Sequence, residues 1–172
     1  VIHADLPWGV MEVEKDQLPG SNKNWLATQR WLNLSDKEKN VTWCSLNSCL
    51  FEVGEMSANI MDSATESPEW IREIKPSGTI YSWVMNNYWN TNFALSQDGM
   101  IRFSYCIQPA KGSYNPAKAN RFGMEQTRPM IAVPVNKAFE YSANMQLSGD
   151  ETVAVSIVKT VDEGKAQIVR LR

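Results

Sequence analysis

MIRFSYCIQ, the stretch from Met100 to Gln108, gives the cleanest alternation of apolar and polar side chains in the chain. One of its faces consists of Ile101, Phe103, Tyr105 and Ile107, and the other consists of Arg102, Ser104 and Cys106. A period of two residues is typical of a strand that buries one face and solvates the other. A turn signal, Gln97-Asp98-Gly99, precedes it. We therefore predict a strand whose apolar face points inward, beside Tyr81 and Trp83 or Val84 of a neighbouring strand.

Working outward from this stretch, strand-like segments recur in both directions. They predict strands at Val10–Glu14, Trp25–Leu34, Val41–Leu46, Cys49–Val53, Gly78–Asn86, Met130–Val133, Thr152–Thr160 and Ala166–Leu171. Asn47-Ser48 has the composition of a hairpin turn, so we expect the two strands that flank it to pair. Strands of alternating pattern bury one face of each sheet, which predicts an all-β fold of stacked antiparallel sheets.

Helical signals are few, so we expect one or two short helices only. Asn115-Pro116 is a plausible N-cap with proline at the first helical position, and it opens a turn or two through Phe122. Ser67-Pro68-Glu69 is a second possible start, with Trp70, Ile71 and Ile74 on one side of the helix. The best domain boundary lies near Pro134–Phe139. It divides the chain into a β-sandwich segment, 1–135, and the start of a smaller β-sandwich, 136–172.

Composition excludes several classes of function. The chain has 172 residues and a formal net charge of −2, and its 17 basic residues are scattered, which argues against nucleic-acid binding. No apolar run approaches the roughly 18 residues of a membrane span. The chain does not begin with Met, and Ala166–Arg172 reads as a strand with no closing turn after it. We therefore expect an excised portion of a larger protein, whose compartment the sequence leaves open.

Two carboxylates and the single histidine are weak candidates for catalysis. Glu12 and Glu14 share a predicted strand face about 6.5–7 Å apart. That spacing overlaps the window of an inverting glycosidase pair. The alternative interpretation is a solvated strand face beside Lys15, and we favour it because a glycosidase pair must flank the sugar from different sides. His3, near the beginning of the chain, is expected to be solvated.

The three cysteines can form neither a disulfide framework nor a four-thiolate zinc site. Cys44 and Cys49 lie on either side of the predicted Asn47-Ser48 turn. In an oxidising compartment they could bridge if their Cβ geometry allowed it. Cys106 is left over from such a pairing, and we favour unbridged structural thiols for all three.

The segment Asn86–Asn92, NNYWNTN, is the most unusual in composition. Asparagine amides both donate and accept hydrogen bonds, which suits sugar hydroxyls, and an aromatic face can receive a pyranose ring. The candidate substrate-binding residues are therefore Asn86, Asn87, Trp89, Asn90 and Asn92. A rigid structural loop is the alternative, because asparagine also satisfies loop backbone groups. The same two interpretations, ligand binding or a rigid structural loop, apply to the polar loop Asp16–Trp25.

These two loops also carry a family resemblance. DQLPGSNKNW (Asp16–Trp25), QRW (Gln29–Trp31), VTW (Val41–Trp43) and YSWVMNNYWNTNF (Tyr81–Phe93) resemble the β-rich C-terminal region of glycoside hydrolase family 38 alpha-mannosidases. The resemblance runs from about Pro7 to Pro129 and more loosely to Arg172. It implies an antiparallel β-supersandwich of the galactose-mutarotase-like type, followed by smaller sandwiches.

The resemblance implies a retaining mannosidase whose chemistry lies elsewhere in the polypeptide. In that family the aspartate nucleophile and a zinc-type divalent metal, held by His and Asp ligands, belong to an N-terminal α/β domain. His3 alone cannot supply two imidazole ligands, so no catalytic residue, metal or cofactor is expected in this chain. The expected partners are the catalytic domain of the same polypeptide and a mannose-containing carbohydrate, with no nucleic acid and no membrane span.

Two other hypotheses stay open at this point. The first is a free-standing carbohydrate-binding module without hydrolase activity, which an exposed Trp89 in an ordered loop would favour. The second is a purely structural module that packs on a catalytic domain outside this chain. A large exposed apolar patch on one side would favour that second hypothesis.

Overall fold

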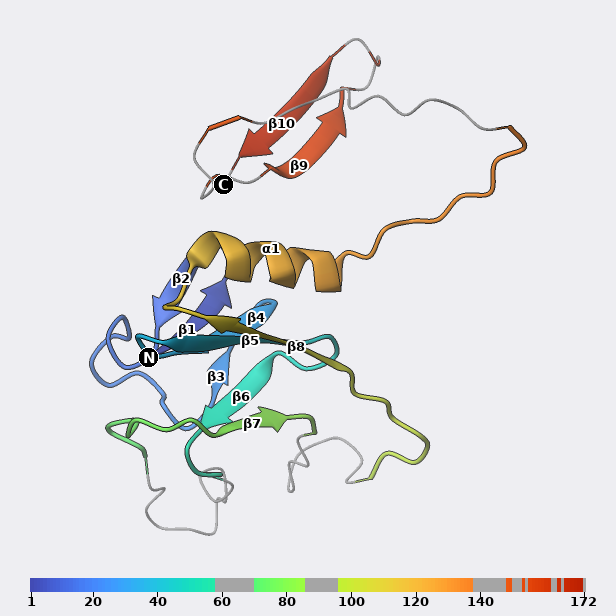
Figure 1. The fold of residues 1–172 in the computed structure, drawn as a ribbon. Coiled ribbons are helices and arrows are strands. Elements are labelled where there is room, and N and C mark those ends of the chain that lie inside the picture. The colour runs from blue at the N-terminus through green and yellow to red at the C-terminus, as the bar shows by residue number, and fades with distance from the viewer. Residues whose placement is uncertain are drawn as a thin grey trace.

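A computed structural model describes residues 1–57, 70–85, 96–137, 148–149, 153, 155–161, 164 and 166–171. The described residues form antiparallel sheets and one short helix, so the predicted all-β, sandwich-like fold is confirmed (Figure 1). The strands are β1 (Ile2–Leu6), β2 (Gly9–Glu12), β3 (Leu26–Ala27), β4 (Trp31–Ser35), β5 (Lys39–Ser45), β6 (Leu50–Val53), β7 (Ile80–Trp83), β8 (Tyr105–Lys111), β9 (Val155–Thr160) and β10 (Gln167–Leu171). The helix is α1 (Pro116–Thr127).

The main body has three layers. A five-stranded sheet, in the order β2-β1-β4-β5-β8, is covered on one face by the three-stranded sheet β3-β6-β7 and on the other face by α1 (Figure 1). The core between the two sheets consists of Ala4, Leu26, Leu32 and Phe51. The core between sheet and helix consists of Trp31, Cys44, Ala119 and Phe122. Neighbouring residues of a strand point to opposite faces. Leu32 of β4 therefore packs in the core between the two sheets, and Trp31 packs in the core between sheet and helix.

Helix α1 begins where the sequence predicts. The side chain of Asn115 accepts a hydrogen bond of 2.9 Å from the Lys118 amide, and Pro116 takes the first helical position. The helix continues to Thr127, beyond the predicted Phe122. A Cβ built on Gly123 would lie 2.2 Å from Cδ1 of Trp31. The helix therefore packs so closely on β4 that only glycine fits at this contact.

The second predicted helix is wrong for the residues that the structure describes. Residues 70–79 are irregular, while 67–69 lie outside the described residues. The amide of Ile71 donates to the Asn24 side chain at 3.2 Å, and the amide of Ile74 donates to Glu14 at 2.9 Å. Side chains of the connection between β2 and β3 thus satisfy backbone donors that a helix would have used internally.

The hairpin predicted at Asn47-Ser48 is also wrong. β5 pairs with β4 and β8, whereas β6 pairs with β3 and β7 in the other sheet. The predicted long strand Trp25–Leu34 is likewise broken, because residues 28–30 cross from β3 in one sheet to β4 in the other. The two crossovers are tied together by the amide of Thr28, which donates to the carbonyl of Cys49 at 2.8 Å.

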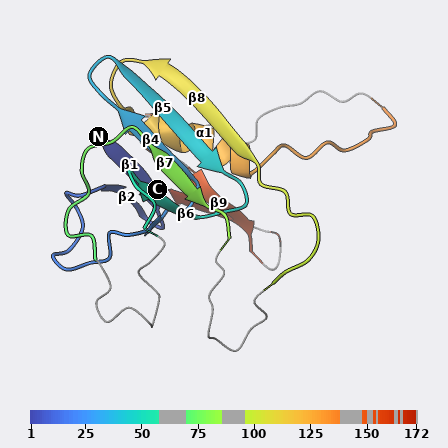
Figure 2. The same ribbon diagram turned by 90° about the horizontal axis from the view of Figure 1, so that it is seen from below.

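The strand predicted from Met100 begins only at Tyr105, and its apolar face is not buried. Tyr105 is 41% exposed and Ile107 is 64% exposed. Its neighbour in the sheet is β5, not the strand that carries Tyr81. The smaller sheet ends at β7, so it leaves this face of β8 uncovered (Figure 2). Within β8 the better-covered face is that of Cys106, which packs against the cluster beneath α1, while Arg102 lies before the strand.

The last two strands form a sheet of their own. β9 and β10 pair antiparallel, with a register shift at Arg170 and Leu171. Both strands were predicted, whereas the predicted strand Met130–Val133 is an extended segment with Met130 99% exposed. No other strand is available beside that segment in the described residues, so its backbone has no ladder to join. The division into segments 1–135 and 136–172 stays a prediction.

Candidate functional site

The Asn-rich segment predicted as a sugar site lies outside the described residues. This applies to all of the candidates Asn86, Asn87, Trp89, Asn90 and Asn92. The strand that leads to it is held firmly, because Trp83 donates its indole N–H to the carbonyl of Met85 at 2.7 Å. Trp83 also meets Trp25 edge to face, with ring centroids 5.2 Å apart. The loop Asp16–Trp25, which carries part of the family resemblance, therefore contacts the strand before the Asn-rich segment.

Glu12 and Glu14 do not form a catalytic pair. Glu12 ends β2 and forms an ion pair with Lys15 at 2.7 Å, whereas Glu14 lies after the strand with φ of 77°. Glu14 bonds to Lys23 and to the amide of Ile74. Desolvation, the largest single influence, raises the pKa of Glu14, but these bonds outweigh it and the net pKa is lowered. A general acid in a glycosidase needs the opposite shift.

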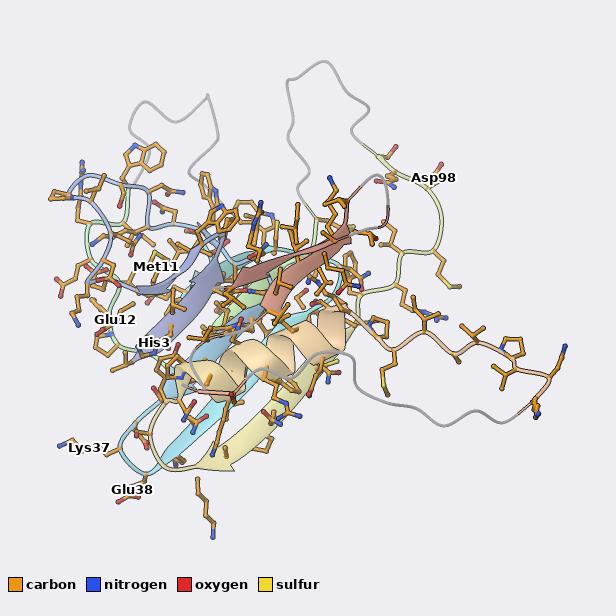
Figure 3. The ribbon with its side chains drawn as sticks, turned by 90° about the horizontal axis from the view of Figure 1, so that it is seen from above. His3, Met11, Glu12, Lys37, Glu38 and Asp98 are labelled. Carbon is orange, nitrogen blue, oxygen red and sulfur yellow. The ribbon has the colours of Figure 1, made fainter. Side chains whose placement is uncertain are left out.

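His3 is half-buried, which corrects the expectation that it is solvated. Its ring stacks on Tyr114 with centroids 3.8 Å apart, and its Nδ1 is buried without a hydrogen-bond partner. Glu12 lies directly opposite on β2 (Figure 3). Desolvation lowers the pKa of His3 in spite of that carboxylate. His3 is therefore a neutral packing residue at pH 7.

All three cysteines are free in this structure. Cys44 is fully buried against α1, while Cys49 is exposed just before β6 in the other sheet. The pairing of Cys44 with Cys49 rested on the hairpin that the structure replaces with a crossover. The residue opposite Cys44 is Cys106 of β8.

An apolar groove lies between the two sheets of the main body. It encloses about 760 Å³ where β5 and β8 extend past β7. Its lining includes Ile2, Leu34, Val41, Trp43, Ile80, Tyr105 and Ile107. The rings of Trp43 and Tyr105 are stacked, with centroids 5.6 Å apart and planes 22° from parallel. The alternating sequence pattern does not reveal this groove, because an apolar strand face looks the same whether or not another part of the chain covers it.

Polar groups mark the rim of the groove. The hydroxyl of Tyr105 meets that of Ser82 across the opening, at 3.2 Å. At another part of the rim, the carboxylate of Asp36 accepts the amides of Glu38 and Lys39, each at 2.8 Å. These bonds, the one from Glu38 first, lower the pKa of Asp36. The groove thus offers an apolar surface with a few fixed hydrogen-bonding groups at its rim.

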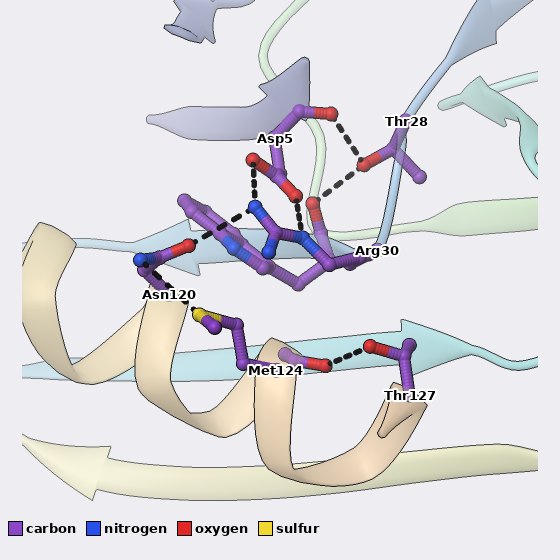
Figure 4. A network of polar contacts seen from close by, with 8 residues as sticks. Asp5, Thr28, Arg30, Asn120, Met124 and Thr127 are labelled. Carbon is purple, nitrogen blue, oxygen red and sulfur yellow. Dashed lines mark hydrogen bonds and ion pairs between the residues drawn. The ribbon is translucent and has the colours of Figure 1, made fainter. Parts of the chain in front are cut away.

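A buried ion pair lies on the other side of the five-stranded sheet (Figure 4). Asp5 is fully buried and accepts two hydrogen bonds from Arg30, of 2.6 and 3.2 Å. Arg30 also donates to Asn120 of α1 at 3.1 Å. Thr28 donates to the carbonyl of Trp31 at 2.6 Å. This network joins β1, the first crossover and the helix, and its full set of partners indicates a structural role.

The described residues do not fit the zinc-type metal that the resemblance implies for the parent enzyme. Nowhere among them do three His, Cys, Asp or Glu side chains come together as ligands for a metal ion. Within the same residues, none of the helical structure has the length and apolar character that a bilayer crossing requires.

No protein-family model, curated protein or solved structure matches this chain.

Proposed function

We propose that this chain is a non-catalytic β module of a retaining alpha-mannosidase, a glycoside hydrolase. It packs on the catalytic domain of the same polypeptide and helps to shape the substrate cleft. The sequence strings around Trp25, Trp43 and Trp83 support the family, and the antiparallel sandwich-like fold agrees with it. The single observation that carries the packing role is the uncovered apolar groove along β5 and β8.

The groove has the properties of a surface made for burial. Ile107 is well exposed at its mouth, and Trp43 and Tyr105 form a continuous aromatic wall beside it. Covering such a surface contributes about 25 cal/mol per Å² of apolar area removed from water. Exposed apolar patches rimmed by polar residues are typical of interaction sites. A neighbouring domain therefore stabilises this module by completing its sandwich.

The sequence upstream of Val1 in the gene gives the most direct test. We expect an α/β domain there with a His-x-Asp motif near its start, as in the family that the chain resembles. A coding sequence that offers no such domain on the same polypeptide would overturn the mannosidase proposal.

The packing role has its own test in the longer polypeptide. Ile107→Lys places a charge in the groove and should lower the midpoint of thermal unfolding by several degrees. Leu18→Lys is the matched control, because Leu18 is 78% exposed in a loop away from the groove. Equal midpoints for the two variants would show that no domain covers the groove.

A carbohydrate-binding module is the second candidate, favoured by the stacked Trp43 and Tyr105 rings next to the Ser82 hydroxyl. Aromatic faces and hydroxyl groups together are suited to a pyranose ring. Titration of the chain with mannose oligosaccharides should then change tryptophan fluorescence, and Tyr105→Ala should abolish the change. An unchanged spectrum at millimolar sugar would leave only the packing role.

A further inference from the structure

Cys44 and Cys106 face each other across two neighbouring strands. They are direct partners in the antiparallel ladder of β5 and β8, and both belong to the cluster beneath α1. Direct partners point to the same face of a sheet. The two thiols are therefore neighbours, although they are far apart in the sequence.

The ladder places this pair close to disulfide geometry. Direct partners in an antiparallel ladder have Cα atoms about 4.5–5.5 Å apart, and a disulfide needs about 4.4–6.8 Å. Their Cβ atoms are about 4.5–5.5 Å apart, somewhat more than the roughly 3.5–4.5 Å of a relaxed disulfide. A bond between them needs only a small approach of β8 toward β5. Since β8 is the edge strand of the sheet, it has a neighbour on one side only in the described residues.

We propose that Cys44 and Cys106 are a redox site, and that they form a reversible cross-strand disulfide when the chain meets a low-molecular-weight disulfide such as oxidised glutathione. The reaction is a thiol–disulfide exchange in two steps. The thiolate of Cys106 attacks one sulfur of the oxidant and releases one thiol, which leaves a mixed disulfide. The sulfur of Cys44 then loses its proton, attacks the sulfur of Cys106 and expels the second thiol. The protein loses two electrons and two protons, and one oxidant disulfide becomes two thiols.

Differences in exposure assign the order of the two thiols. Cys106 is half-exposed at the sheet edge, where an oxidant reaches it, whereas Cys44 is fully buried under the helix. Burial, followed by the neighbouring Cys106, raises the pKa of Cys44 to about 12. The thiolate is the reacting species, so ring closure by Cys44 is the slow step. Its rate should rise about tenfold per pH unit between roughly pH 7 and pH 9.

The bond would be a labile one that controls the edge strand. A disulfide that draws strands together stores strain and is more easily reduced than a relaxed structural one. When closed, it fastens β8 to β5 and so fixes Tyr105 and Ile107, the neighbours of Cys106 that line the groove. The redox state of this pair thus sets how rigidly one wall of the groove is held.

The test uses the whole chain, fully reduced and then incubated with oxidised glutathione at mildly alkaline pH. Because the exposed Cys49 also takes up glutathione, free thiols are counted in the Cys49→Ser variant, where they should fall from two to none while the intact mass falls by about 2 Da as two hydrogens are lost. A non-reducing peptide map should show a single bond between the peptides of Cys44 and Cys106. A bond between Cys44 and Cys49, a bond between two molecules, or glutathione retained on Cys106 without closure would each overturn the proposal.

Further variants provide the controls. The wild-type chain should form the same bond as Cys49→Ser, with one glutathione added at the exposed Cys49. In the Cys49→Ser background, Cys44→Ser should keep one glutathione on Cys106, and Cys106→Ser should resist oxidation at Cys44. Circular dichroism of each reduced variant establishes that it is folded. If a variant fails to fold, the peptide map of the wild-type chain still decides the outcome by itself.

Discussion

At the scale of single residues, the contact between Gly123 and Trp31 sets how closely α1 packs on β4. The missing side chain of Gly123 lets α1 lie directly on the indole of a fully buried tryptophan. Gly123→Ala should destabilise the chain, because overpacking costs about 1–3 kcal/mol and exceeds the gain in helix propensity of up to about 1 kcal/mol. Urea denaturation measures the difference. Gly78→Ala, where a Cβ meets nothing within 4 Å, is the control. A more stable Gly123→Ala variant would contradict this packing.

His3 should make the stability of the folded chain depend on pH. Desolvation by burial lowers the pKa of the folded-state imidazole below its ordinary value near 6.5. The unfolded chain therefore binds the proton more readily, and the contribution of His3 to stability is complete above that value and is lost as the pH falls below it. We expect the thermal midpoint to drop between pH 7.5 and pH 5.5. His3→Phe keeps the stacking on Tyr114 but should reduce this drop. An identical drop in both proteins would assign it to other groups.

At the scale of elements, α1 depends on its first turn. The Asn115 side chain satisfies the Lys118 amide, which otherwise has no partner within the helix. Asn115→Ala should cost about 1 kcal/mol of unfolding free energy. Asn115→Asp should retain nearly all of the stability, because aspartate accepts the same hydrogen bond. The two midpoints in urea, measured side by side, check this, and equal losses would show that the cap is unimportant.

The same scale shows what could be predicted from the sequence. The alternation of side chains predicted most of the strands, and Asn115-Pro116 predicted the start of the helix. Strand partners could not be predicted, because alternation near Cys44 and Cys49 says nothing about which sheet each strand joins. The groove was missed for a related reason. Tyr105 and Ile107 look like core residues, and only the three-dimensional arrangement shows that the smaller sheet stops short of them.

At the scale of the whole molecule, we expect the isolated chain to have no hydrolase activity. It should release no aryl group from aryl mannosides, with or without added zinc or calcium. A catalytic zinc site needs three protein ligands and an open position, and the described residues bring no such ligand set together. A spectrophotometric assay checks this, with a known mannosidase as the positive control. Metal-dependent turnover that persisted through extensive purification would contradict the expectation.

The two crossovers described above also determine how the chain must fold. Residues 28–30 and 46–49 each carry the chain from one sheet to the other, and β8 follows β6 and β7 in the sequence before it pairs with β5. Neither sheet can therefore be completed on its own from a continuous piece of chain. Folding of this kind closes long loops before it gains their contacts, so it is slow compared with that of a helical bundle of similar size. The uncovered wall of β5 and β8 stays open to solvent during that time, which makes a chaperone or a neighbouring domain most valuable while the protein is being synthesised.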